Sequence, residues 1–159
     1  MTAGRDLGWP YCDPDQDDNH PAGSLASVPL VPDAATNAGG TKMNCAALTP
    51  IEVGLPAHTA PLGLTFLEGS KIPAPWSGGA VIGGHGSWDR HPPQAPAVLW
   101  LAWNAAKGTL EPAVTLVSGF ENPDGSYWGR PVDAVPGPDG ALYVSDDTAG
   151  AIYRLAPPT

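Results

Sequence analysis

The chain has 159 residues, which is enough for one ordinary domain with a core and too few for two large ones. Sixteen acidic side chains against seven Lys and Arg give a formal net charge of −9, which disfavours binding to nucleic acid or to an anionic membrane surface. Glycine and proline contribute 20 residues each and disfavour regular helix, whereas six Trp allow a folded core, so the composition favours strands, turns and long loops.

The N-terminal third shows no targeting or secondary-structure pattern. Residues 1–10 lack the order of a signal peptide, and no apolar run of about 18 residues predicts a membrane span. Residues 13–44 show neither a strand period nor a helix period and are expected to form a long irregular loop. Cys12 and Cys45 flank this loop and either form one disulfide in an oxidising compartment or remain unrelated thiols.

After Leu48 the sequence changes to short apolar runs of strand length, each bounded by Gly, Pro or Asp. Gly137–Gly140 places Pro and Asp at β-turn positions, and Asp146–Gly150 supplies a second turn signal. We therefore expect a β-meander over Trp128–Leu155. The expected strands are Leu62–Leu67, Ala80–Ile82, Ala97–Trp103, Val114–Val117, Ala141–Val144 and Ala151–Leu155.

Helix signals are weak in the same region. Trp103–Lys107 is compatible with one helical turn, which Gly108 would end. Short strands with turns at this spacing are typical of a sandwich, a barrel or a propeller, and periodicity alone does not choose among them.

One candidate functional segment is the glycine-flanked loop Gly83–His91, which follows an expected buried strand. It gathers several polar side chains, including His85 and Ser87, where the backbone can approach a ligand closely. The alternative is a wide turn whose polar side chains only satisfy local backbone groups.

A second candidate is Trp128–Asp133, at the entrance to the meander. The planar guanidinium of Arg130 can bind a carboxylate through two hydrogen bonds, and Asp133 is placed to hold that guanidinium in position. The alternative is an Arg–Asp pair that only fixes a loop. Pro136 falls in the inner strand expected after Asp133, a position tolerated mainly at a sheet edge or a bulge.

His58 lies before the expected strand at Leu62 and is a third candidate. A lone histidine in such a place is more often a structural hydrogen-bonding group than a ligand contact. This residue is therefore the weakest of the three candidates on sequence alone.

Several familiar motifs are disfavoured. The segment from Asp13 begins like a calcium loop, but Asp18 and Ser24 stand where that loop needs its glycine and its bidentate glutamate. The glycines around His85 do not form a phosphate or dinucleotide pattern, and no spaced Cys and His set predicts zinc. Ser87 and His85 lack a readable third group for a hydrolase.

Four segments together resemble the glucose/sorbosone dehydrogenase family, and the resemblance extends over nearly the whole chain apart from residues 13–44. The C-terminal segment, WGRPVDAVPGPDGALYVSDDTAGAIYRL, is the longest and most specific of them. The segments are Asp6–Cys12, His58–Leu64, Gly83–Gln94 and Trp128–Leu155.

The resemblance implies a six-bladed β-propeller that binds pyrroloquinoline quinone (PQQ) and calcium and oxidises an aldose or a sorbosone-type sugar aldehyde. In that family the base histidine and the calcium loop precede the Gly8-Trp9-Pro10 element. We therefore expect residues 1–159 to form the C-terminal portion of such an all-β propeller, with about two blades over residues 48–159 and the irregular loop at residues 13–44. We expect no catalytic residue or metal ligand in this portion, and no activity from it alone.

The same resemblance implies which residues line the cofactor site. Arg130 matches an arginine at the cofactor carboxylates, His58 falls at a cofactor-contacting position, and His85 with Ser87 falls in a loop that presents another polar contact. Trp128 and Asp133, which flank Arg130, complete the expected cofactor-binding set.

The expected partners follow from the family: a sugar substrate and an external electron acceptor, in the periplasm or outside the cell, with further blades and a secretion signal upstream of Met1. Exposed blade faces are also expected to favour self-association. Two alternatives stay open on sequence alone, namely a non-catalytic propeller fragment that binds a ligand or protein and a lactonase-like propeller hydrolase.

Overall fold

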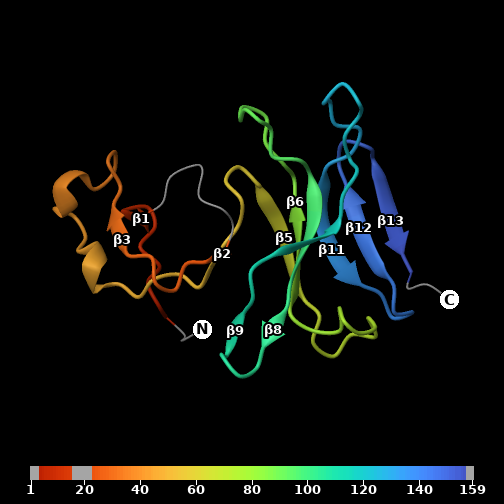
Figure 1. Ribbon diagram of the computed structural model, residues 1–159, viewed down its shortest axis with the longest axis horizontal. Helices are drawn as coiled ribbons and strands as arrows, with labels where there is room; N and C mark the ends of the chain where they lie inside the picture. The colour runs from red at the N-terminus through yellow and green to blue at the C-terminus, as the bar shows by residue number, and fades with distance from the viewer. Residues whose placement is uncertain (1–3, 16–22, 157–159) are drawn as a thin grey trace.

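The structure is a computed structural model that describes residues 4–15 and 23–156. It is built of strands, turns and two short 3₁₀ turns, which confirms the expected all-β class. Two antiparallel sheets lie side by side, and a smaller N-terminal lobe sits beside the first of them (Figure 1). Both sheets are open, and the described residues do not close into a propeller.

The first sheet has four strands in the order β10-β7-β6-β5, so each strand pairs with the next of these four along the chain. A small hairpin of β8 (Trp103–Asn104) and β9 (Thr109–Leu110) interrupts the meander. The helical turn considered at Trp103–Lys107 is present only as the single turn of this hairpin, in which the Gly108 amide donates to the Asn104 carbonyl at 2.9 Å. Asn104 ends β8, and its side chain accepts hydrogen bonds from the next backbone amides, which favours a turn there. The four strands are β5 (Pro61–Phe66), β6 (Ala80–Gly84), β7 (Ala97–Leu101) and β10 (Val114–Val117).

The second sheet is the expected C-terminal meander. Its first turn closes with a hydrogen bond from the Gly140 amide to the Gly137 carbonyl at 3.2 Å, and in the second turn Asp146 accepts the Ala149 amide at 2.8 Å. Pro136 is the last residue of an edge strand, the position where a missing backbone donor is tolerated. The strands are β11 (Pro131–Pro136), β12 (Leu142–Asp146) and β13 (Ala151–Leu155).

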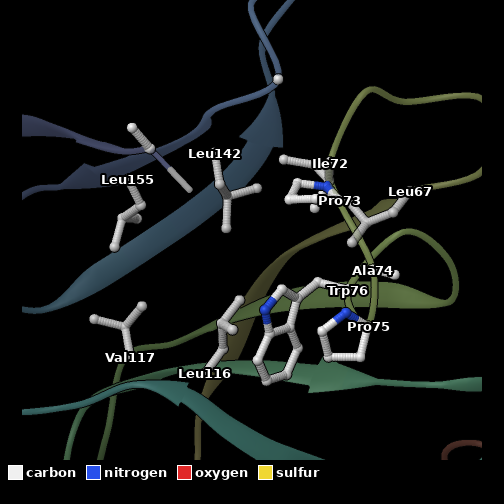
Figure 2. A pocket seen from close by; sticks show the side chains of 12 residues that line it. Leu67, Ile72, Pro73, Ala74, Pro75, Trp76, Leu116, Val117, Leu142 and Leu155 are labelled. Carbon is white, nitrogen blue, oxygen red and sulfur yellow. The ribbon is translucent and has the colours of Figure 1, made fainter. Parts of the chain in front are cut away.

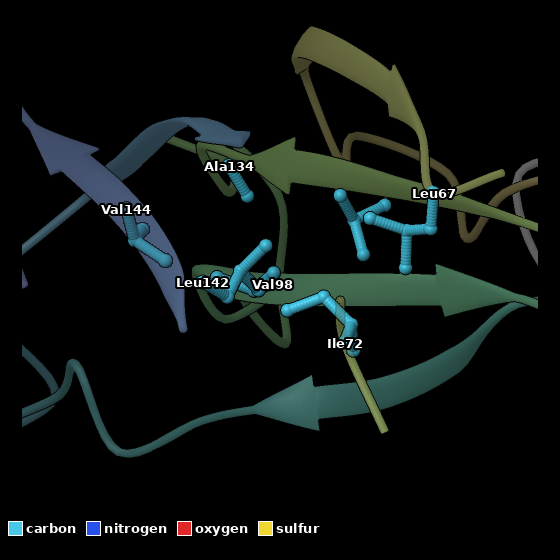
Figure 3. Close-up of a cluster of buried hydrophobic side chains, with 7 residues drawn as sticks. Leu67, Ile72, Val98, Ala134, Leu142 and Val144 are labelled. Carbon is cyan, nitrogen blue, oxygen red and sulfur yellow. The ribbon is translucent and has the colours of Figure 1, made fainter. Parts of the chain in front are cut away.

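The main hydrophobic core lies between the two sheets. Strands β6 and β7 and the loop after β5 contribute one side, and β11 and β12 contribute the other (Figure 3). Burying these aliphatic side chains from both sheets provides the main favourable term that holds the pair together. The cluster consists of Leu67, Ile72, Val81, Val98, Ala134, Leu142 and Val144.

Two glycines let β11 approach the face of the first sheet. A Cβ atom on Gly83 would overlap the Val132 carbonyl, and one on Gly63 would overlap the Asp133 carboxylate. Val132 lies where the register of β11 against β12 shifts, so the bulged strand brings its backbone against β6. The start of β11 is thereby fixed beside the end of β6.

In the described parts of residues 13–44, the N-terminal lobe contains short strands and a 3₁₀ turn, where an irregular loop was expected. Cys12 and Cys45 form a disulfide, so the paired alternative is the right one. The side chain of buried Asn37 donates to the Tyr11 and Met43 carbonyls and accepts two backbone amides in return. The lobe contains β1 (Cys12–Pro14), β3 (Leu30–Pro32), the pair β2 (Gly23–Ser24) and β4 (Val53–Gly54), and the 3₁₀ turns η1 (Ala38–Gly40) and η2 (Cys45–Ala47).

Two expectations from the sequence concern a calcium loop and a membrane span. The disfavoured calcium loop runs from Asp13 into residues 16–22, which are not described. For membrane insertion, the described ranges contain no helix of the length and apolar character needed to cross a bilayer.

Candidate functional site

The described chain has two notable hollows with very different linings. The larger, about 380 Å³, lies between the sheets and is walled by aliphatic, proline and Trp76 side chains (Figure 2). None of its lining residues is titratable, so it offers no acid, base or charged group for chemistry. The smaller, about 230 Å³, gathers polar groups and is the candidate site; it is lined by His58, Ala60, His85, Gly86, Ser87, Trp88, Asp89 and Arg130.

Strand pairing explains why these residues meet. Because β5 and β6 are antiparallel, with Pro61 opposite Gly84, the segment before β5 lies beside the segment after β6. The close packing of β11 on Gly83 brings the segment before β11 to the same end. Three separate stretches of sequence, at His58, at residues 85–89 and at Arg130, thus converge at one end of the two sheets, where the loops lie together in Figure 1.

Arg130 is held by backbone oxygens rather than by a carboxylate. Its Nε donates to the His85 carbonyl at 2.7 Å and its Nη2 to the Gly86 carbonyl at 2.8 Å, while the guanidinium lies over the Tyr127 ring at 5.5 Å. No ion pair joins Arg130 to Asp133 among the described residues, so the expectation that Asp133 holds the guanidinium in position is wrong. The guanidinium is therefore a fixed cation in the pocket wall, and no carboxylate of the described residues lies within ion-pair distance of it.

Each of the two histidines lies beside an aspartate, and the His85 pair is a hydrogen bond. His85 Nε2 lies 2.9 Å from Asp147 Oδ1, and His58 Nδ1 lies 3.3 Å from Asp89 Oδ1. The hydrogen bond from His85 lowers the pKa of Asp147 below its usual value. Within the described contacts, the second ring nitrogen of each histidine has no protein partner and remains available to a ligand.

The backbone before β5 is strained where it lines the pocket. His58 and Ala60 have positive φ angles of 62° and 46°, in a region that non-glycine residues rarely occupy. Buried Thr59 between them anchors the turn through its hydroxyl, which donates to the Pro56 carbonyl at 2.6 Å. Strain of this kind persists only where surrounding contacts over-determine it, and it is commonly found at functional sites.

Ser87 lines the pocket but has a structural task. It closes the loop over residues 87–94: its amide donates to the Gln94 carbonyl at 2.9 Å, and its Oγ accepts the Gln94 amide at 2.8 Å. No hydrogen bond joins Ser87 to His85 among the described contacts, so the pair is not arranged as a nucleophile and a base.

Two of the expected site residues lie outside the pocket lining. Trp128 packs against Phe120 and Tyr153 and donates its indole N–H to the Gly119 carbonyl at 2.9 Å, so it supports the loop that leads to Arg130. Asp133 accepts the Ala134 amide at 2.8 Å within β11.

Three residues of the site were not singled out from the sequence. Trp88 and Asp89 belong to a segment that was identified, but their roles depend on which way the loop turns. Asp147 lies 62 positions from His85, and the sequence carries no signal that pairs them.

This chain is similar to known proteins in both structure and sequence. A solved structure of the holo form of the pyranose dehydrogenase PQQ domain from Coprinopsis cinerea superposes with a TM-score of 0.50 at 27% identity, covering 92% of this chain and 39% of that one. The curated PQQ-dependent pyranose dehydrogenase of Coprinopsis cinerea is 33% identical over 121 residues, and an uncharacterised protein of Borreliella burgdorferi is 37% identical over 101.

These relatives are much longer than the regions that match. Each of the two sequence alignments covers 64% of this chain, but they cover only 15% of the Coprinopsis cinerea enzyme and 27% of the Borreliella burgdorferi protein. The resemblance to PQQ-dependent sugar dehydrogenases found in the sequence is confirmed by these matches. Residues 1–157 match the sequence profile described as TrAA12-like, and the chain therefore belongs to the TrAA12-like family.

Proposed function

We propose that the pocket at His58, His85 and Arg130 is one wall of a PQQ site in a sugar dehydrogenase. In this proposal the two sheets are neighbouring blades of a larger propeller. Two observations support it: the match to a holo PQQ domain extends over 92% of this chain, and each sheet is an antiparallel meander. The chain's own contribution is binding and orientation, and the family's base and calcium ligands belong to other blades.

The residues present fit PQQ, a planar quinone that carries several carboxylates. Arg130 carries the argument, because its guanidinium is fixed by two carbonyls and still has N–H groups that make no described contact. A carboxylate would accept those donors in the bidentate geometry that arginine favours. The ring nitrogens of His58 and His85 that make no described contact offer further hydrogen bonds to the quinone periphery.

When bound, PQQ would supply the acceptor for the hydride that leaves a sugar carbon as that carbon is oxidised. The rigid wall described above would hold the cofactor in a single orientation, because a preorganised site loses little entropy on binding. On this proposal the chain alone is inactive, and the complete protein passes electrons to an external acceptor. The disulfide between Cys12 and Cys45 supports a periplasmic or extracellular location, where such bonds persist.

PQQ binding by the full chain tests the proposal. Titration with PQQ, followed by cofactor absorbance and calorimetry, is expected to give saturable binding. Replacing Arg130 by Gln removes charge-assisted hydrogen bonds and is expected to weaken binding by about ten- to a hundredfold.

Arg154→Gln is the matched control. Arg154 is paired with Asp139, whose turn is at the opposite end of the second sheet from Arg130, so this change removes the same side chain away from the pocket. Wild-type affinity is expected for this variant. Absence of saturable binding to the wild-type chain, or equal losses in both variants, would contradict the proposal.

A further inference from the structure

Trp88 is 88% exposed, although it lines the same pocket as Arg130, and cofactor binding by His58, His85 and Arg130 does not account for it. Leaving a large indole in water forgoes the stabilisation that its burial would give. An exposed aromatic ring at the lip of a polar pocket is suited to stacking against a ligand.

We propose that Trp88 is a stacking platform for the ring of a pyranose sugar, with Asp89 beside it as a partner for the sugar hydroxyls. This inference rests on the proposed function, and it deepens that function by assigning a substrate subsite to this chain. A pyranose has an apolar C–H face and a rim of hydroxyls. The indole matches the first, and the Asp89 carboxylate matches the second.

The loop that carries Trp88 is held at several points. Ser87 and Gln94 close it with two hydrogen bonds. Arg90 donates to the Ala57 carbonyl at 3.3 Å, and Asp89 meets His58 at 3.3 Å, so both tie the loop to the segment before β5. The backbone that carries the ring is therefore fixed, so mainly the side-chain torsions of Trp88 are ordered when a sugar stacks on it.

The polar neighbours favour a small polar ligand over a protein surface. The Asp89 side chain is 59% exposed and keeps acceptor capacity beyond its contact with His58, which suits vicinal hydroxyl donors. Trp9 provides a comparison within the same chain: it is 82% exposed, but it lies in the N-terminal lobe and does not line the pocket. Exposure of an indole alone therefore does not define the subsite.

The test follows the indole N–H signals of the ¹⁵N-labelled full chain by NMR, with and without PQQ. The six Trp residues give six signals, and the Trp88 signal is the one lost in Trp88→Phe. Titration with D-glucose as the pyranose probe is expected to shift the Trp88 signal saturably and to leave the Trp9 signal in place. Glycerol, a polyol without a ring, is expected to shift neither.

Affinity for D-glucose is then compared between variants by saturation-transfer NMR. Trp88→Ala is expected to weaken sugar binding by about tenfold, whereas Trp88→Phe, which keeps an aromatic face, retains most of it. An unmoved Trp88 signal, a Trp9 signal that moves equally, or unchanged affinity in Trp88→Ala would overturn the subsite.

These results are separable from the cofactor proposal. PQQ binding with an unresponsive Trp88 leaves the cofactor site standing and removes the sugar subsite. A sugar response at Trp88 without PQQ binding leaves the sugar subsite standing and removes the cofactor site.

Discussion

Arg130 reaches the pocket because two glycines leave room for the strand that follows it. Gly63 and Gly83 leave room for β11 to lie directly on the first sheet, and Arg130 immediately precedes that strand. The arginine then donates to the carbonyls of His85 and Gly86 in the loop after β6. The charge in the pocket and the packing of the two sheets therefore depend on the same close backbone approach.

Gly83→Ala tests that dependence. The added methyl would overlap the Val132 carbonyl, a backbone group that cannot rotate away, so the free energy of unfolding is expected to fall by about 1–3 kcal/mol. Urea denaturation measures it as a lower midpoint at constant slope. Gly78→Ala is the control, because a Cβ there meets nothing within 4 Å, and its effect is expected to stay within about 0.5 kcal/mol. Equal midpoints for the two variants would mean that β11 does not lie against β6 as described.

The sequence identified the pocket residues whose local setting is unusual. His58, His85 and Arg130 stand out beside Gly and Pro, where strands end and backbone is free to approach a ligand. Their partners were not predictable: Asp133 is near Arg130 in sequence, yet carbonyls more than 40 positions away hold the guanidinium. Strand pairing decides those contacts, and a single sequence does not encode them locally.

At the scale of elements, prediction succeeded where turn residues and apolar runs agree. The Gly137–Gly140 turn and its flanking strands combine a proline, an aspartate and a glycine with positive φ, so each local signal indicates the same hairpin. Residues 13–44 have no such agreement. Their strands are short and are held by a disulfide and by buried Asn37, which are long-range constraints without a periodic signature.

The Gly137–Gly140 turn also makes a prediction about pH. Hydrogen bonds to Asp139, first from Arg154 and then from the Ala141 amide, lower its pKa from 3.8 to about 2. Because the folded pKa is below the unfolded value, this contribution to stability is complete above pH 3.8 and is lost as the pH falls through about 2.

Thermal unfolding of the wild type and of Asp139→Asn across this range measures the effect. The wild type is expected to have the higher Tm near neutrality, by a small margin because the carboxylate is exposed, and the two Tm values are expected to converge as the pH approaches about 2. A Tm difference that stays constant down to that pH would show that the ionised carboxylate is not the stabilising group.

At the scale of the whole molecule, the two sheets cover only one face of each other. Leu62, Leu64 and Phe66 on the edge strand β5 are all exposed, while Gly63 between them faces β11. The opposite face of the same sheet carries the shared core. An apolar row on an open edge strand is a surface on which another sheet can pack, and we propose that isolated chains associate through it.

Sedimentation velocity over a range of protein concentrations tests this association. The wild-type chain is expected to form species larger than a monomer as concentration rises, and Leu64→Lys is expected to shift the distribution towards monomer, because association would then bury an unpaired charge. Val114→Lys is the control: Val114 is exposed to a similar degree, 48% against 53% for Leu64, but lies on β10 at the other edge of the sheet. A wild-type chain that stays monodisperse and monomeric at every concentration, or a Val114→Lys variant that dissociates equally, would rule out the β5 face as the contact.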